Sequence, residues 1–300
     1  PAVEGQYLHD RLALNLYPLN AYNITLKQKT TTQDGMTTKE VYAYNPETLQ
    51  LVEKRLVHPD EYELTSTYVY PNDVYGTVYQ GMTRKHILSL IIEEKFFRND
   101  SLIACKLQEY QEYPKDYKTS LLLPYKTHFS EINSFLPKET LTFLGEGFIN
   151  KDIYPSDNVE YCKYDHYGNL IHVVLNKTVS YVYLWGYGGQ YPIAEISNTS
   201  YEEVQRALGG QLPESLSSIA SPDFTMLDLL REKLPQAHIT TYKYDPGIGM
   251  TEKISPAGHT TYYEYDGLGR MNRSYIKVKD NNGIEQEQTL KALDYHYRED

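Results

Sequence analysis

Histidines are the residues here whose chemistry would be easiest to place, because they act both as general bases and as metal ligands. The chain holds nine histidines among 300 residues, and no two have the four-residue spacing of a helical metal site. His166 and His296 stand in or beside short polar segments that are typical of turns. We therefore interpret both as structural or solvated, and the sequence predicts no metal site.

Acidic residues gather in one segment that has little regular patterning: Glu146, Asp152, Asp157 and Glu160. Two carboxylates on either side of a substrate can act as acid and base or as acid and nucleophile. Spacing alone assigns neither role, and a solvated acidic loop is the simpler interpretation. If the protein were an enzyme, we would look for its active site in residues 145–160.

Two glycine-containing segments superficially resemble ligand-binding loops. Gly186–Gly189 has no following helix pattern that would point backbone N–H groups at a phosphate, so a bulge or corner explains it. Lys279–Gly283 lacks the alternating oxygen ligands of a calcium loop and reads as a turn. No nucleophile elbow, phosphate-binding loop or zinc-protease motif occurs. We predict no catalytic residue, no cofactor and no enzymatic activity.

The clearest pattern in the sequence is in residues 261–271, and it indicates local structure and not catalysis. Tyr263 and Tyr265 are two apart, so both rings point to one face of an extended strand. Asp266 can accept a backbone N–H two residues on, and Gly269 tolerates the positive φ that closes such a turn. This pattern predicts a β-hairpin with an aromatic cross-strand face. Replacing the turn Asp by Ala is expected to cost about one hydrogen bond, less than replacing the turn Gly by Val.

The hairpin pattern recurs along the chain. Twenty-one residues separate Tyr244 from Tyr265, and 21 separate Tyr164 from Trp185. Such a fixed period indicates a repeat array, in which each unit packs against its neighbours. The residues that define the repeats are Tyr164, Asp165, Gly168, Tyr183, Trp185, Tyr242, Tyr244, Asp245, Gly249, Tyr263, Tyr265, Asp266 and Gly269, with weaker copies at Tyr42 and Tyr68.

Y-x-Y-D-x-x-G-x-L at this spacing resembles the YD-repeat, or RHS-repeat, family of large bacterial proteins. The segments Asp73–Met82, Lys85–Ser89 and Tyr183–Ala194 are similar to sequences of one RHS subgroup. The resemblance covers most of the chain from about residue 40. Cys162 stands where the first Tyr of its unit is expected, and Gly186 replaces the turn Asp. We interpret these two units as drifted copies.

The resemblance implies a long β-ribbon that spirals into a hollow, shell-like container. In that family the container commonly encloses or presents a variable C-terminal domain, often a toxin. The implied partners are flanking repeats and a C-terminal domain of the same longer chain, and the implied location is secreted or at the cell surface. The chain begins at Pro1 and ends at the opening of another unit, so we expect it to be part of a longer protein.

Composition fits a strand-rich protein. Tyrosine supplies 31 residues against seven Phe and one Trp, and tyrosine favours strands. A net charge of −11 argues against nucleic acid or an anionic membrane as partner. No apolar stretch approaches the ~20 residues of a membrane-spanning helix. Cys105 and Cys162 are too few for a disulfide scaffold, so we expect packed or free thiols.

These patterns predict a mainly β fold with one antiparallel sheet and a small two-helix insertion at about residues 197–236. Ser200–Glu203 forms a capping box, and Ser221–Pro222 opens a second helix, so helices are expected only at roughly 200–209 and 222–234. Strands are expected from Leu12 to Tyr110, and irregular loops with one or two short strands over 111–158. We divide the chain into an N-terminal β region, 1–160, and a YD-repeat region, 161–300.

The alternative to a scaffold is a carbohydrate- or cell-surface-binding repeat module. Tyrosines on an exposed sheet can stack on sugar rings, since each offers a flat apolar face and a hydroxyl. Two tyrosines on one hairpin face more often pack against the next unit, which favours the scaffold.

Overall fold

The structure is a computed structural model that describes residues 24–59, 62–114, 120–132, 136, 149–154, 158–279 and 283–295. Within these residues, sixteen strands form one open antiparallel sheet, in which each strand pairs with the next along the chain. The predicted mainly β, antiparallel fold is confirmed. The strands expected between Leu12 and Tyr22 lie outside the described residues.

The strands are β1 Gln28–Gln33, β2 Met36–Tyr44, β3 Leu51–Val57, β4 Glu63–Val69, β5 Glu93–Arg98, β6 Ser101–Pro114, β7 Ser120–Glu131, β8 Val159–Tyr164, β9 Leu170–Leu175, β10 Val179–Gly186, β11 Tyr191–Ser197, β12 His238–Asp245, β13 Gly249–Ile254, β14 Thr260–Tyr265, β15 Met271–Lys279 and β16 Glu285–Ala292. The helices are α1 Thr77–Arg84, α2 Tyr201–Ala207 and α3 Phe224–Lys233, with 3₁₀ segments η1 Pro71–Asp73, η3 Lys151–Ile153 and η4 Pro213–Ser218.

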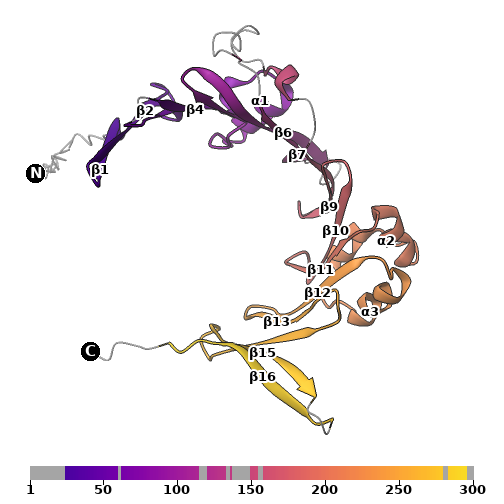
Figure 1. Cartoon of the computed structure of the whole chain (residues 1–300). Coiled ribbons are helices and arrows are strands. Elements are labelled where there is room, and N and C mark those ends of the chain that lie inside the picture. Colours follow the sequence, from indigo (N-terminus) through magenta and orange to yellow (C-terminus); the bar gives the residue numbers. More distant parts are fainter. Residues whose placement is uncertain are drawn as a thin grey trace, which may run out of the picture.

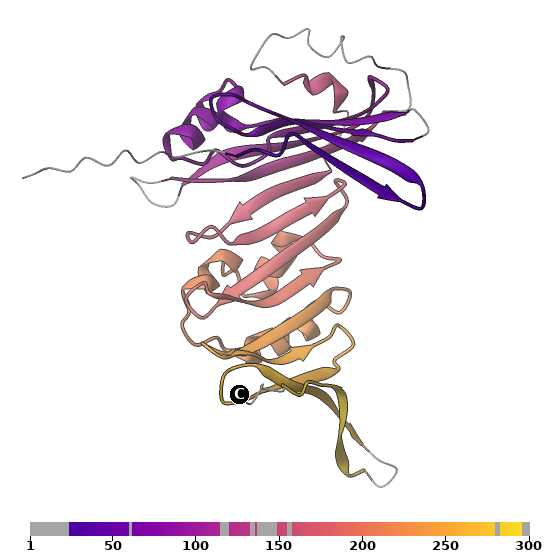
Figure 2. The same cartoon turned by 90° about the vertical axis from the view of Figure 1, so that its left-hand side faces the viewer.

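The sheet is curved. In Figure 1 the strands follow an arc, and α2 and α3 lie on its outer side. Figure 2 looks at the inner side of the arc, with strands in front of these two helices. We call the side that carries α2 and α3 the convex face and the other side the concave face. Because consecutive strands pair, the turns after even-numbered strands follow one long edge of the sheet, and those after odd-numbered strands follow the other.

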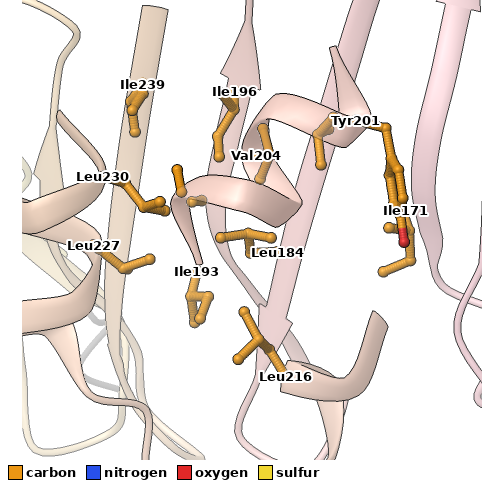
Figure 3. Packing of buried hydrophobic residues seen from close by; sticks show 13 residues of the cluster. Ile171, Leu184, Ile193, Ile196, Tyr201, Val204, Leu216, Leu227, Leu230 and Ile239 are labelled. Atoms are coloured by element: carbon orange, nitrogen blue, oxygen red, sulfur yellow. The ribbon is translucent and has the colours of Figure 1, made fainter. Parts of the chain in front are cut away.

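Two apolar cores cover parts of the sheet. The larger core joins β9–β12 to the helical insertion, and Figure 3 shows strand residues Leu184, Ile193 and Ile196 facing helix residues Val204 and Leu227. The second core joins β5 and β6 to α1, η3 and the segments around them. Its buried members are Val74, Met82, Ile92, Phe97, Leu102, Cys105, Leu107 and Tyr154.

The helical insertion between β11 and β12 is confirmed. The Ser200 hydroxyl accepts a hydrogen bond from the Glu203 N–H at 3.2 Å, and the Glu203 carboxylate accepts from the Ser200 N–H at 2.9 Å. This is the predicted capping box. Helix α3 begins at Phe224 and not at Pro222 as expected, because Asp223 is its N-cap and accepts a hydrogen bond from the Thr225 N–H. The additional 3₁₀ segment η4 lies between the two helices.

Two expectations are wrong. Helices are not confined to residues 200–234, because α1 precedes them; its β-branched residues have low helix propensity, but its Met82 is fully buried in the second core and anchors it. The described part of residues 111–158 is not mainly irregular either, because β7 is a long strand that pairs with β6. The proline of β7, Pro124, lies at a β-bulge, where a missing N–H is tolerated.

Candidate functional site

The first recurring element is a turn built around an aspartate. The Asp165 carboxylate accepts hydrogen bonds from the N–H groups of Tyr167 at 2.9 Å and Asn169 at 2.8 Å. The Gly168 N–H donates to the Asp165 carbonyl at 3.1 Å, and Gly168 has φ of 91°. His166 lies inside this turn, in ring contact with Tyr167, which agrees with a structural role. The predicted positive φ at Gly168 is confirmed.

The turn at Asp266 has the same geometry. Its carboxylate accepts from the N–H groups of Leu268 and Arg270, both at 2.9 Å, and the Gly269 N–H donates to the Asp266 carbonyl at 3.0 Å. Hydrogen bonds from the Arg270 guanidinium lower the pKa of Asp266 below its usual range. Gly269 has φ of 74°, as predicted.

Gly269→Val is expected to lower the free energy of unfolding by about 1–3 kcal/mol, because a β-branched residue is strained at positive φ. Gly267→Val is the matched control: neither glycine has an atom within 4 Å of an added Cβ, but only Gly269 has positive φ. Urea denaturation of both variants measures the difference. Equal losses would mean that φ does not constrain this turn.

Two further turns depart from the sequence-based interpretation. Ser255 opens a similar turn on the opposite edge of the sheet, where its hydroxyl accepts from the His259 N–H at 3.2 Å and its carbonyl accepts from the Gly258 N–H at 2.9 Å. We did not predict this turn, because a serine replaces the aspartate. After Asp245, Gly249 does not take the place of Gly269; it lies under the neighbouring unit, where an added Cβ would be 2.5 Å from the Tyr265 hydroxyl.

The second recurring element is a hydrogen bond from an aromatic side chain to the backbone near the start of the preceding strand or segment. The Tyr265 hydroxyl donates to the Met250 carbonyl at 2.8 Å, and the Trp185 indole N–H donates to the Leu170 carbonyl at 2.9 Å. We call these inter-unit bonds, because donor and acceptor belong to successive hairpins. The others are Tyr44 to Leu26, Tyr70 to Leu51, Tyr164 to Pro124 and Tyr295 to Met271.

A register shift precedes most of these aromatic donors. In the β14–β15 pair it falls between Glu264 and Tyr265, and in the β10–β11 pair it falls between Leu184 and Trp185. A β-bulge re-aims a side chain and increases local twist. The bulges therefore aim the donors at the neighbouring unit and contribute to the curvature of the sheet. Register shifts also precede the donors Tyr44 and Tyr164, at Ala43/Tyr44 and Lys163/Tyr164.

The β10–β11 hairpin, in which Gly186 stands in place of the turn aspartate, is connected to its neighbour by tyrosines. The Tyr244 ring stacks on Tyr191, with centroids 4.6 Å apart, and the Tyr244 N–H donates to the Tyr187 hydroxyl at 3.1 Å. Gly186 lies against the helical insertion, because an added Cβ would be 2.5 Å from Cγ of Pro222. Glycine is therefore required at this corner by the close approach of the insertion.

The faces on which the other tyrosines of the repeats lie follow from the alternation of side chains along each strand. Val182 and Leu184 point into the core under the helices, so Tyr181 and Tyr183 between and beside them lie on the concave face. The aromatic cross-strand pair of the β14–β15 hairpin is Tyr262 with Tyr275, stacked at 5.2 Å. We expected it on the Tyr263 face, but Tyr263 pairs with Ser274. Tyr242 pairs with Lys253, whose amino group lies over its ring.

One cluster of titratable side chains lies in the second core. Glu93 is 3% exposed, and its carboxylate accepts from the Tyr154 hydroxyl at 2.9 Å and from the Lys95 amino group at 2.5 Å. Burial raises the pKa of Tyr154, and the nearby Glu93 charge raises it further. Tyr154 is therefore a neutral hydrogen-bond donor. Both carboxylate oxygens of Glu93 are engaged, so this pair stabilises the fold and offers no free base.

Glu109 lies beside this cluster on a cavity of about 320 Å³. Its carboxylate is 2.6 Å from His128 Nε2 and 2.6 Å from the Lys151 amino group. Burial by itself would raise the pKa of Glu109, but hydrogen bonds from Lys151 and His128 lower it overall. The carboxylate is thus held ionised between two basic groups, which ties η3 to the sheet.

Two members of the acidic segment singled out in the sequence, Asp152 and Glu160, lie within the described residues. Asp152 lies in η3, whereas Glu160 lies in β8 at 3.8 Å from the Lys126 amino group. Glu146, Asp157 and His296 lie outside the described residues. Over the described ranges, no three His, Cys, Asp or Glu side chains are grouped so that they could hold a metal ion. Cys105 and Cys162 are both free thiols.

Acidification is expected to weaken the Glu109 cluster. Because the folded pKa of Glu109 is lowered, its contribution to stability is present above the unfolded pKa of about 4.3 and is lost as the pH falls through the folded value. Urea midpoints between pH 7 and pH 3 should therefore fall less steeply for Glu109→Gln than for the unchanged protein. Glu131→Gln, at an exposed position of β7, is the control. Parallel curves for all three would contradict this expectation.

Comparison with known proteins gives only distant structural likenesses. No family model matches the chain, and no curated protein matches it. The Photorhabdus luminescens Tc holotoxin pore with the TccC3-D651A mutation aligns at 8% identity and a TM-score of 0.31, covering 87% of this chain and 12% of that one. The TcdB2–TccC3 structure without its hypervariable C-terminal region aligns at 9% identity and a TM-score of 0.33, with the same coverage.

The chain thus spans 12% of the length of these two solved chains, and we draw no functional argument from the likeness. In the part of the chain that the structure describes, every helix is too short or too polar to cross a bilayer.

Proposed function

We propose that the chain is a non-enzymatic structural scaffold. It would be part of an RHS/YD-repeat type of shell that encloses or presents a variable C-terminal domain, such as a toxin, of the same longer chain. The observation that carries this proposal is the set of six inter-unit bonds, in which an aromatic side chain of one hairpin donates to the backbone of the preceding strand or segment. The acceptors of these bonds are backbone carbonyls, which every residue has, so the bonds need no ligand. They are what a self-supporting repeat array requires.

The curvature of the sheet supports enclosure. The helical insertion covers the convex face, and the inner side of the arc is formed by strands (Figures 1 and 2). A longer array with the same curvature would surround a space on its concave side. A secreted or cell-surface location, which the family resemblance implies, is part of this proposal.

The outer strands support flanking repeats as partners. All residues of β1 and of β16 are exposed, and among the described strands each of the two has only one neighbour in the sheet. Unpaired strand edges recruit other strands. We expect the chain alone to self-associate, and more so at high salt, because salt screens the repulsion from its net charge of −11. Light scattering at low and high salt tests this; association that is independent of both salt and added flanking repeats would contradict it.

Limited proteolysis of the natural protein that contains this chain tests enclosure. The region after residue 300 should resist protease while the scaffold is folded, and Leu184→Ala, which weakens the larger core, should make it sensitive at moderate temperature. Leu268→Ala, at a side chain that is 72% exposed, should leave resistance unchanged. Equal sensitivity of all three proteins would overturn enclosure. Reproducible hydrolysis of an ester, peptide or glycoside, abolished by one His or carboxylate substitution, would overturn the non-enzymatic assignment.

A carbohydrate-binding module is the second candidate function. It is favoured by the Tyr181 and Tyr183 rings of β10, which are within 12° of parallel with centroids 6.5 Å apart. Adjacent rings of this kind can form a stacking surface for successive sugar units.

A further inference from the structure

Two hairpin tips carry the same three-residue pattern, an asparagine followed by any residue except proline and then by serine or threonine. The tip between β5 and β6 contains Asn99–Ser101, and the tip between β9 and β10 contains Asn176–Thr178. Both tips follow odd-numbered strands, so they lie on the same long edge of the sheet, opposite to the edge of the Asp165 turn. Enzymes that attach a sugar to an asparagine side chain recognise this pattern in surface loops.

The geometry of the turns explains the asparagines but not the hydroxyl residues that follow them. Asn99 has φ of 46° and Asn176 has φ of 48°, a conformation that asparagine tolerates better than most residues. The turn between β1 and β2 begins with the same conformation, with φ of 52° at Asp34, yet Met36 stands two residues later. The turn itself therefore does not require serine or threonine at that position.

Both tips are open to a modifying enzyme. Asn99, Asn176 and Thr178 are exposed. The Asn99 side-chain oxygen accepts a hydrogen bond from the Glu63 N–H at 2.8 Å, and its side-chain nitrogen is the atom that a sugar would occupy. Because an N-linked sugar leaves the amide oxygen in place, this hydrogen bond and the modification are compatible.

The sequence has three further copies of the pattern, which begin at Asn23, Asn198 and Asn272. Asn23 lies outside the described residues. The side-chain nitrogen of Asn198 donates to the Gln236 carbonyl at 2.7 Å, so the fold uses it. Asn272 belongs to β15, and its side-chain oxygen is buried. Asn198 and Asn272 are therefore internal comparisons for the two open tips.

We propose that Asn176 and Asn99 are sites of N-linked glycosylation, with a glycosyl diphosphate as the donor. In the transfer, the side-chain nitrogen forms a bond to the anomeric carbon of the sugar. The bond from that carbon to the diphosphate oxygen breaks, the diphosphate leaves with the electron pair, and the amide loses one proton. The step needs no oxidant or reductant. This proposal goes beyond the scaffold and does not depend on it.

Mass spectrometry of peptides from the natural protein, isolated from its own source, tests the proposal. Fragmentation that keeps side-chain modifications intact should locate a sugar on Asn176 and on Asn99, and should find Asn198 and Asn272 unmodified. Thr178→Ala, at an exposed position, should abolish the modification of Asn176 and leave that of Asn99 unchanged in the same molecule. Thr178→Ser keeps the hydroxyl group and should preserve both.

The attached mass distinguishes the two sources of the donor, and either result supports the proposal. A single hexose would indicate a nucleotide-linked sugar, and a preassembled oligosaccharide would indicate a lipid-linked one. Absence of sugar from both Asn176 and Asn99 would overturn the proposal. Sugar that remains on Asn176 in the Thr178→Ala variant would overturn it as well, because recognition would then not depend on the pattern.

Discussion

Leu184→Ala is expected to lower the free energy of unfolding by about 2–5 kcal/mol, the largest loss that we predict for a single change. The Leu184 side chain is fully buried in the centre of the larger core (Figure 3). It lies between the sheet and the helical insertion, and truncation would remove apolar contacts and leave a cavity that close-packed neighbours only partly fill. Urea denaturation followed by circular dichroism measures the loss.

Two leucines of the same chain serve as matched controls for Leu184. Leu268 in the Asp266 turn is 72% exposed, and Leu229 on α3 is 49% exposed. Their alanine variants should change stability by less than about 1 kcal/mol, since about half of Leu229 and most of Leu268 are already exposed to water. If either control lost as much as Leu184→Ala, the insertion would not be packed on the sheet as described.

Asp165→Ala is expected to cost about 2–4 kcal/mol, because it removes several charge-assisted hydrogen bonds at a buried site. Asp165 is only 1% exposed, and its carboxylate accepts from the N–H groups of Tyr167 and Asn169 and from the Asn169 side-chain amide at 3.0 Å. The sequence-based expectation of one hydrogen bond for the turn aspartate is therefore wrong here. The cost should equal or exceed that of the turn Gly→Val substitutions.

Asp165→Asn and Asp245→Ala separate the contributions to this effect. Asparagine keeps an oxygen that can accept the two backbone N–H bonds, so Asp165→Asn should recover part of the loss. Asp245 opens the corresponding turn after β12 but is exposed, so Asp245→Ala should cost less than 1 kcal/mol, about the value of a surface change. Thermal unfolding of the three variants gives the order; an Asp245→Ala loss as large as that of Asp165→Ala would contradict it.

Local patterns sufficed for much of the fold. The hairpin turns at Asp165 and Asp266 depend on side chains that bond their own backbone, so a few adjacent residues specify them. The capping box at Ser200 is equally local. Helix α1 and strand β7 were not predicted, because both depend on residues far away in the sequence. Helix α1 is stabilised by burial of Met82 among side chains of β5 and β6, and the bulge at Pro124 of β7 is defined only by pairing with β6.

The acceptors of the inter-unit bonds could not be predicted from the sequence, but the spacing between donor and acceptor could. Their acceptors are backbone carbonyls, so no residue type marks them. Their spacing, however, is constant where the turns are regular: 15 residues separate donor and acceptor both for Trp185 with Leu170 and for Tyr265 with Met250. A period of 21 combined with an aromatic side chain 15 residues after the start of a strand would have located them.

Electron cryo-microscopy of the natural protein that contains this chain tests the central claim most directly. The scaffold account predicts a continuous curved sheet in which flanking repeats pair with β1 and β16, with the helical insertion outside and density for the following domain on the concave side. A following domain attached to the convex face, or hairpins of this chain that separate rather than continue into flanking repeats, would contradict it.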